Sequence, residues 1–114
     1  EKNDILKRQG AGDVGGETEK KHLPAFTVVR TCVLIPQGCM DVHIKIGEIE
    51  HPSTPEHYIM FIDLYLDKKY IARVYLTPAS LHPAVAFHLK ASGGTLTAVE
   101  RCNLHGYWAA DTTL

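Results

Sequence analysis

Apolar residues gather in short runs from residue 25 onward, and turn residues separate the runs, which is typical of an all-β chain. The first run, 25–35, ends at the turn "PQG". In 41–50, Val42, Ile44 and Ile46 alternate with polar residues, and Ile49 is the next apolar position after Gly47. This change of phase predicts a β-bulge near Gly47.

The second half of the chain contains the strongest strand patterns. The run 58–66, "YIMFIDLYL", is apolar enough to be buried on both faces, and "DKK" connects it to 70–76 as a predicted hairpin. "ASGG" joins 84–90 to 95–101, which we interpret as a second hairpin. The spacing of the turns predicts a seven-stranded, immunoglobulin-like β-sandwich.

The first residues have a different composition from the rest. Residues 1–21 contain ten charged residues and four glycines, and we interpret them as a polar N-terminal arm before one domain, 22–114. Within the arm, Asn3 or Asp4 could cap a short helix that ends at Gly10. A chain of 114 residues fits a single domain with one core.

Charge and cysteine usage narrow the functional classes. The chain has 12 Lys and Arg against 13 Asp and Glu, so its net charge does not favour nucleic acid or an anionic membrane as a partner. With no apolar stretch near the ~20 residues of a membrane span and no signal-peptide pattern, we expect a soluble protein. An odd, sparse cysteine set favours a reducing compartment, the cytoplasm. For Cys32 and Cys39 we favour small buried thiols over a redox pair.

Metal-ligating residue types occur at strand ends and in loops. In "RCNLHGYW", Cys102 and His105 are three residues apart across a tight turn, so a thiolate and an imidazole could reach one metal ion. His51 and His57 flank a loop that contains two prolines, and prolines reduce the freedom that is lost when a loop is ordered. Taken alone, Cys102 and His105 also fit a buried cysteine beside an exposed histidine. His51 and His57, taken alone, also fit a solvated surface turn.

His22, in "EKKHLPAF", adds a fourth imidazole. Five candidate ligands argue against zinc, which prefers four-coordinate tetrahedral sites. One thiolate with four imidazoles suits a mononuclear non-haem iron whose sixth position is open.

Three motifs then resemble the superoxide reductase family, the iron domain of desulfoferrodoxin and neelaredoxin: "KHLP" at 21–24, "HPSTPEHYI" at 51–59 and "CNLHGYW" at 102–108. The resemblance implies four equatorial histidine ligands and one axial cysteine. It also implies one-electron reduction of superoxide to hydrogen peroxide by Fe2+/Fe3+ iron and re-reduction by a rubredoxin-like donor. The implied ligands are His22, His51, His57, His105 and Cys102.

Two features differ from the family pattern. Nothing before His22 provides the four cysteines of a second iron centre, so the resemblance implies a one-iron form, expected as a homo-oligomer (dimer or tetramer). The family's Glu-Lys-His triplet is replaced by Lys20-Lys21-His22, with the glutamate at Glu19. Lys21 matches the lysine that attracts superoxide and helps protonate the product, and Glu19 is a candidate sixth ligand.

The remaining histidines are expected to be exposed: His43 and His88 within strands, and His82 in a turn. Tyr107 and Trp108 fit core or rim packing better than a role at the site edge.

Two other functional classes stay open as alternatives. A cupredoxin-like electron carrier would need a copper site of two histidines and one cysteine, often with a later methionine, and none follows Cys102. A plain immunoglobulin-like binding module would need no metal.

Overall fold

The computed structural model describes residues 6–8 and 17–114. It contains the following elements: α1 (Glu17–His22), β1 (Pro24–Val29), β2 (Met40–Ile46), β3 (Ile59–Leu66), β4 (Lys69–Tyr75), β5 (Ala84–Leu89), β6 (Thr95–Cys102) and β7 (Gly106–Thr113). Among the described residues, no helix is long and apolar enough to cross a membrane.

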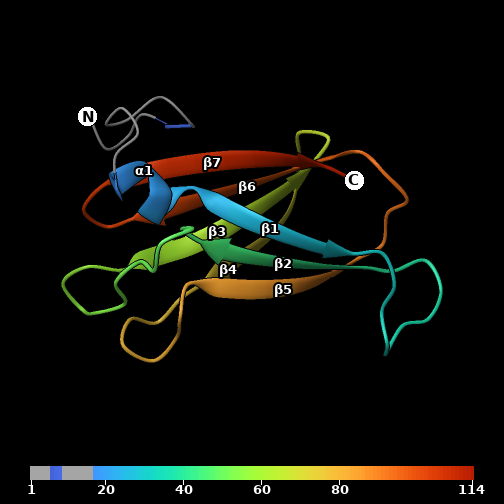
Figure 1. Ribbon diagram of the computed structural model, residues 1–114, viewed down its shortest axis with the longest axis horizontal. Helices are drawn as coiled ribbons and strands as arrows, with labels where there is room; N and C mark the ends of the chain where they lie inside the picture. Colours follow the sequence, from blue (N-terminus) through green and yellow to red (C-terminus); the bar gives the residue numbers. More distant parts are fainter. Residues whose placement is uncertain (1–5, 9–16) are drawn as a thin grey trace.

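The strands form two antiparallel sheets packed face to face, so the predicted seven-stranded sandwich is confirmed (Figure 1). One sheet has the order β1-β2-β5 and the other the order β4-β3-β6-β7. The predicted hairpin of 84–90 with 95–101 is wrong, because β5 pairs with β2 whereas β6 pairs with β3 and β7. The connection "ASGG" therefore crosses from one sheet to the other.

The hairpin of β3 with β4 is confirmed. Asp67 and Lys68, in its two-residue turn, have φ angles of 49° and 69°. Positive φ at both central positions is the geometry of a type I′ turn, whose twist matches that of the flanking strands.

Gly47 does not form the predicted bulge. Strand β2 ends at Ile46, and Gly47 begins a turn with φ of 87°. A Cβ at this position would collide with the backbone carbonyl groups of Ile49 and Lys21. The glycine thus lets the end of β2 approach the end of α1, and backbone hydrogen bonds from Gly47 to Leu23 and from Ile49 to Lys20 fix this contact.

The two inner sheet faces form one core with alternating buried residues. Its fully buried members are mostly aliphatic: Val42, Ile44, Ile46, Ile62, Leu64, Leu96 and Ala98. Strand β7, which no sequence pattern singled out, completes the larger sheet next to β6. Because aliphatic side chains fill the space between the sheets, we look for the candidate metal ligands at the ends of the sandwich, where the loops meet.

The N-terminal arm is partly described. Lys7 forms a parallel bridge with Trp108, so residues 6–8 run along β7 and are not helical. The rest of the helix predicted up to Gly10 lies outside the described residues. Helix α1 contains the last residues of the arm and His22, and the boundary between arm and domain at residue 22 stays a prediction.

The expectation for two cysteines is wrong. Cys32 and Cys39 are buried as predicted, but they form a disulfide across the β1–β2 loop, with Cα atoms 5.7 Å apart. The loop returns the chain between adjacent antiparallel strands, which brings the residues at its two ends together. Because two of the three cysteines form a disulfide, the cysteine usage no longer supports the prediction of a reducing compartment. Cys102 is free and buried.

Candidate metal centre

Loops and strand ends at one end of the sandwich bring five candidate ligands together. His22 is the last residue of α1, Cys102 is the last residue of β6, and His105 lies in the three-residue turn before β7. His51 and His57 flank the proline-containing loop that leads into β3. The structure therefore gathers every residue that the motifs indicated, from positions as far apart as 22 and 105.

The four imidazoles form a square. Around it, ring centroids of successive histidines are 4.8 Å apart for His22 and His51, 4.6 Å for His51 and His57, 5.1 Å for His57 and His105, and 4.8 Å for His105 and His22. Successive rings are steeply inclined, at 65–80° to each other. His22 and His57 lie across the square, with centroids 6.4 Å apart.

The Cys102 sulfur lies over this square. Its Sγ is 3.4 Å from Nε2 of His51 and 3.7 Å from Nδ1 of His105, two histidines at opposite corners. The Nε2 atoms of His22 and His51 are 3.2 Å apart. Metal–nitrogen and metal–sulfur bonds of about 2.1 and 2.3 Å at right angles would separate the donor atoms by about 3.0–3.1 Å. Four imidazoles around a square and a sulfur at similar distances from two opposite corners fit one metal ion.

Hydrogen bonds on the far side of the rings orient two of the histidines. Nδ1 of His22 is 2.5 Å from the Thr18 carbonyl oxygen, and Nδ1 of His51 is 2.6 Å from that of Pro52. In each ring Nδ1 must donate to the carbonyl, which leaves Nε2 as a lone-pair donor toward the centre. Trp108 stacks on His22 with centroids 5.1 Å apart and donates from Nε1 to the His105 carbonyl. Trp108 is therefore both buried, as predicted, and in contact with the site.

Burial sets the protonation of the cluster. Desolvation is the main reason why the pKa values of His22 and His51 fall to about 4, and the neighbouring histidines lower them further. The same cause lowers the pKa of His57. These imidazoles are neutral near pH 7, which is the form that binds metals. Burial raises the pKa of the Cys102 thiol, so a metal ion must displace its proton on binding.

Asn103 fixes the loop that carries His57, a role that the sequence patterns did not reveal. Its Oδ1 accepts from the Tyr58 amide at 2.9 Å, and its Nδ2 donates to the Glu56 carbonyl at 3.0 Å. Its own amide also donates to the Tyr58 carbonyl. Asn103 follows Cys102 directly, so it ties the His57 loop to the turn of Cys102 and His105. Its place inside the "CNLHG" motif is the signal that could have suggested this.

We expect Asn103→Ala to weaken metal binding by about 10–100-fold, the usual cost of removing an outer hydrogen bond at a metal site. The substitution frees the backbone on both sides of His57 but removes no ligand. Ser53→Ala is the matched control, because the Ser53 hydroxyl donates to Leu81 near the other end of the same loop. Competition with a chelator measures both variants. Equal metal affinity in the two would show that Asn103 does not position His57.

The other predicted residues have different surroundings. Lys21 is half-buried beside the square, and its charge lowers the pKa values of His51 and His57. Glu19 is buried in α1 and Lys20 is exposed. The three remaining histidines are exposed, as predicted: His43, His82 and His88.

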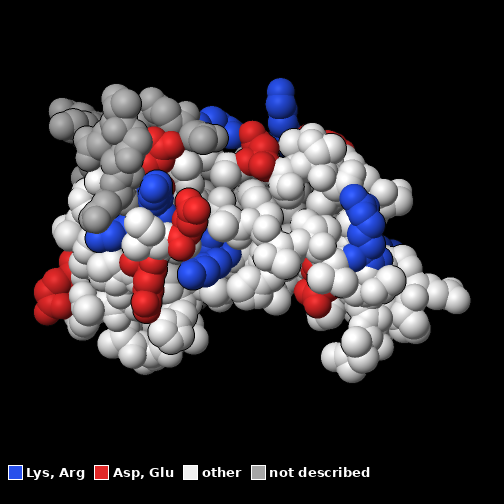
Figure 2. Space-filling model, in the orientation of Figure 1, with Lys and Arg blue, Asp and Glu red and all other residues white. Residues whose placement is uncertain are grey.

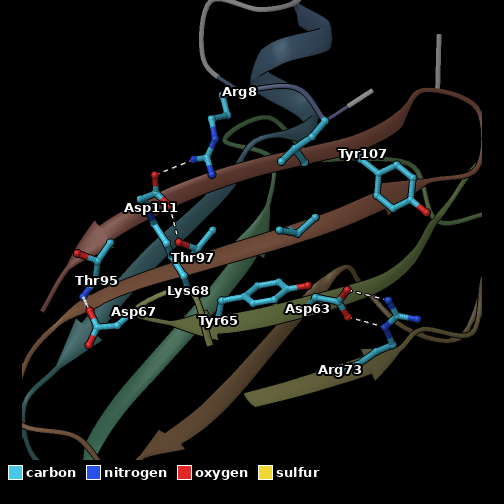
Figure 3. A pocket seen from close by; sticks show the side chains of 12 residues that line it. Arg8, Asp63, Tyr65, Asp67, Lys68, Arg73, Thr95, Thr97, Tyr107 and Asp111 are labelled. Carbon is cyan, nitrogen blue, oxygen red and sulfur yellow. Dashed lines mark hydrogen bonds and ion pairs between the residues drawn. The ribbon is translucent and has the colours of Figure 1, made fainter. Parts of the chain in front are cut away.

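A large cavity lies elsewhere on the molecule. It has a volume of about 730 Å³ and lies on the outer face of the larger sheet, where Arg73 pairs with Asp63 and Arg8 with Asp111 (Figure 3). Its lining contains no histidine or cysteine. The candidate metal ligands therefore lie outside this cavity, in the cluster at the sandwich end.

Comparison with known proteins agrees with this geometry. The desulfoferrodoxin family model matches residues 15–111. A superoxide reductase from Pyrococcus horikoshii is 34% identical over 115 residues, covering 91% of this chain and 93% of its own length. A putative superoxide reductase from Methanocaldococcus jannaschii is 37% identical over 99 residues, covering 82% of each chain.

A solved structure supports the same relationship. A variant of the superoxide reductase (neelaredoxin) from Ignicoccus hospitalis superimposes with a TM-score of 0.78 at 25% identity, covering 96% of this chain and 93% of the other. The cluster also differs from a cupredoxin site of two histidines and one cysteine, because four histidines gather beside Cys102. From its motifs, its sandwich and these relatives, the chain belongs to the desulfoferrodoxin family of superoxide reductases.

Proposed function

We propose that this chain is a superoxide reductase that converts superoxide to hydrogen peroxide at a mononuclear non-haem iron held by His22, His51, His57, His105 and Cys102. The observation that carries the proposal is the square of four imidazoles with a thiol sulfur close to two of its opposite corners. Sequence relatives that are named superoxide reductases support it independently.

Two further observations support iron as the metal that these five residues hold. Nε2 of His57 is buried and has no hydrogen-bond partner in the described part of the chain, although a buried polar atom normally has one. A metal ion at the centre of the square would satisfy it. Five donors exceed the four that a structural zinc ion takes, and a mixed nitrogen and sulfur set suits a redox metal.

The surroundings of three proposed ligands explain how each would act. Bound iron would supply the single electron that superoxide takes up, while two protons complete the peroxide. The carbonyls of Thr18 and Pro52 hold His22 and His51 with Nε2 toward the centre. Cys102, with an exposed fraction of 0%, keeps its sulfur away from water and from the peroxide product. The Cys102 thiolate would donate electron density to bound iron, which favours release of a peroxide.

Metal analysis of protein purified without added metal tests the cofactor directly. About one iron per chain supports the proposal. Copper at that ratio would favour an electron carrier instead, and no stoichiometric metal would favour a binding module.

Lys21 is proposed to attract superoxide to the open side of the square. It lies close enough to lower the pKa values of His51 and His57, and Lys20 precedes it on the surface. Charges of both signs lie side by side around α1, so the attraction is short-ranged (Figure 2). We also propose that the same ammonium group helps to protonate the product.

Lys21→Ala should slow the second-order reaction with superoxide by roughly tenfold at low salt, the lower end of what electrostatic steering contributes. It should also flatten the dependence of the rate on ionic strength, because that dependence comes from the charge removed. Lys20→Ala is the matched control and should have a smaller effect. Pulse radiolysis at several salt concentrations measures both, and equal effects would remove the special role of Lys21.

Glu19 is proposed as a sixth ligand of oxidised iron. It lies one helical turn before His22, so both side chains extend from the same face of α1. In Glu19→Ala, the visible absorption band of the oxidised protein near neutral pH should shift, because the iron would lose a carboxylate ligand. Glu48→Ala is the control, since Glu48 is exposed. An unchanged spectrum in Glu19→Ala would mean that the carboxylate does not bind the metal.

The electron donor, the assembly and the cellular compartment are proposed together with this activity. A rubredoxin-like protein is proposed as the electron donor, and a homo-oligomer, a dimer or a tetramer, as the assembly. Cytoplasmic detoxification of superoxide is the proposed setting. Sedimentation of the iron-loaded chain tests the assembly, and turnover with reduced rubredoxin tests the donor.

A further inference from the structure

A second group of sulfur and imidazole side chains lies far from the metal centre. Cys32 and Cys39 are at the β1–β2 loop, at the opposite end of the sandwich from α1 (Figure 1). Strand β1, with six residues, separates the two ends by about 20 Å at the usual rise per residue. The proposed chemistry of the iron does not use these residues.

His88 contacts one of the two sulfurs. Its Nδ1 is 3.5 Å from Sγ of Cys39, and donor atoms of Cys32, Cys39 and His88 all lie within 4.8 Å of one another. Asp41 is the direct partner of His88 in the pairing of β2 with β5, so both side chains lie on the same outer sheet face. A thiol beside an imidazole, with a carboxylate next to the imidazole, is the arrangement that activates a nucleophile.

Small molecules can reach this group. Cys39 retains 8% exposure whereas Cys102 has 0%, and His88 is exposed. The loop between the cysteines carries no charged residue, and its tip exposes Val33 and Leu34 by 97% and 84%. In Figure 2, the projecting tip of the β1–β2 loop is free of Lys, Arg, Asp and Glu. The surface next to the disulfide is therefore uncharged and apolar, which suits a neutral small molecule better than an ion.

We propose that Cys32, Cys39 and His88 form a second, thiol-based redox centre that is oxidised by hydrogen peroxide. The source of the peroxide rests on the proposed function, whose product it is. The disulfide is the oxidised form of the centre, and His88 selects Cys39 as the attacking thiol.

The steps balance in atoms and electrons. His88 takes the proton of the Cys39 thiol, and the thiolate attacks one peroxide oxygen. An S–O bond forms, the O–O bond breaks, and the leaving hydroxide takes a proton to become water. Cys39 is then a sulfenic acid, oxidised by two electrons. The Cys32 sulfur attacks that of Cys39, so that the S–S bond forms, the S–O bond breaks and a second water leaves. A dithiol reductant restores both thiols by exchange.

The test uses the full-length, iron-loaded chain with its disulfide reduced by a dithiol, which is then removed without oxygen. One equivalent of hydrogen peroxide is added, and free thiols at Cys32 and Cys39 are followed by alkylation and peptide mass spectrometry. His88→Ala is compared with His43→Ala, an exposed histidine on the neighbouring strand β2. Because iron also consumes peroxide, a double Cys32→Ser, Cys39→Ser variant gives the background in every experiment.

In the wild type and in His43→Ala, both thiols should be lost together as one disulfide. His88→Ala should slow this loss by about tenfold or more, toward the range that general bases contribute. In Cys32→Ser, dimedone should trap a sulfenic acid at Cys39, whereas Cys32 in Cys39→Ser should react far less. Equal rates in the two histidine variants, or equal trapping at the two cysteines, would show a purely structural disulfide. Since peroxide is added directly, loss of superoxide reduction would leave this result unaffected.

Discussion

Replacing Cys102 with serine should remove the visible absorption band of the oxidised, iron-loaded protein and most of its superoxide reductase activity. The band is expected because a soft thiolate bound to ferric iron gives a low-energy charge-transfer transition. Sγ of Cys102 is the only sulfur in the described cluster, 3.4 Å from Nε2 of His51. A serine hydroxyl cannot donate charge in the same way. The fold should persist, because serine is close to cysteine in volume.

Variants at the other two cysteines provide the control. Cys32→Ser and Cys39→Ser break the disulfide at the far end of the sandwich and should leave the band unchanged. Visible spectra and circular dichroism of all three variants separate loss of the ligand from loss of the fold. A band that survives in a folded Cys102→Ser protein would show that another group binds the metal on the axis.

Substituting alanine for His51 or His57 should reduce iron affinity by more than about 100-fold, which exceeds the usual cost of losing an outer hydrogen bond. Each substitution opens one corner of the imidazole square. Even with all four rings in place, Nε2 of His57 is buried and has no hydrogen-bond partner in the described part of the chain, so it needs the metal as its partner. Iron content per folded chain, after dialysis against a chelator, measures the effect.

His43→Ala and His82→Ala are the matched controls, because both histidines are exposed and lie outside the cluster. These two variants should keep about the wild-type iron content. Equal iron loss in all four variants would mean that the square of imidazoles is not the iron site.

The candidate ligands could be singled out from the sequence because they lie in short motifs whose chemistry is local. Cys102 and His105 are three positions apart across a tight turn, so their side chains could be expected to lie close together. His22, His51 and His57 were assigned by resemblance, since no local pattern says that α1 and the loop before β3 end at the same place. The order of the histidines around the square depends on tertiary structure and was not accessible from the sequence.

Other features escaped prediction for identifiable physical reasons. The pairing of β5 with β2 depends on contacts between distant residues, whereas the sequence showed only two strands joined by a short connection. Gly47 was interpreted from the change of hydrophobic phase, but its role is the close approach to Lys21, which only the packed chain reveals. An odd number of cysteines argued against a disulfide, although two of the three can pair while Cys102 stays free.

The reaction of the reduced, iron-loaded protein with a pulse of superoxide tests the proposed function most directly. Iron oxidation, hydrogen peroxide and dioxygen are followed in the same experiment. We expect one peroxide for each iron oxidised, no dioxygen, and loss of this reaction in Cys102→Ser. Release of dioxygen with half a peroxide per superoxide would indicate dismutation, and iron that stays reduced would contradict superoxide reduction at this site.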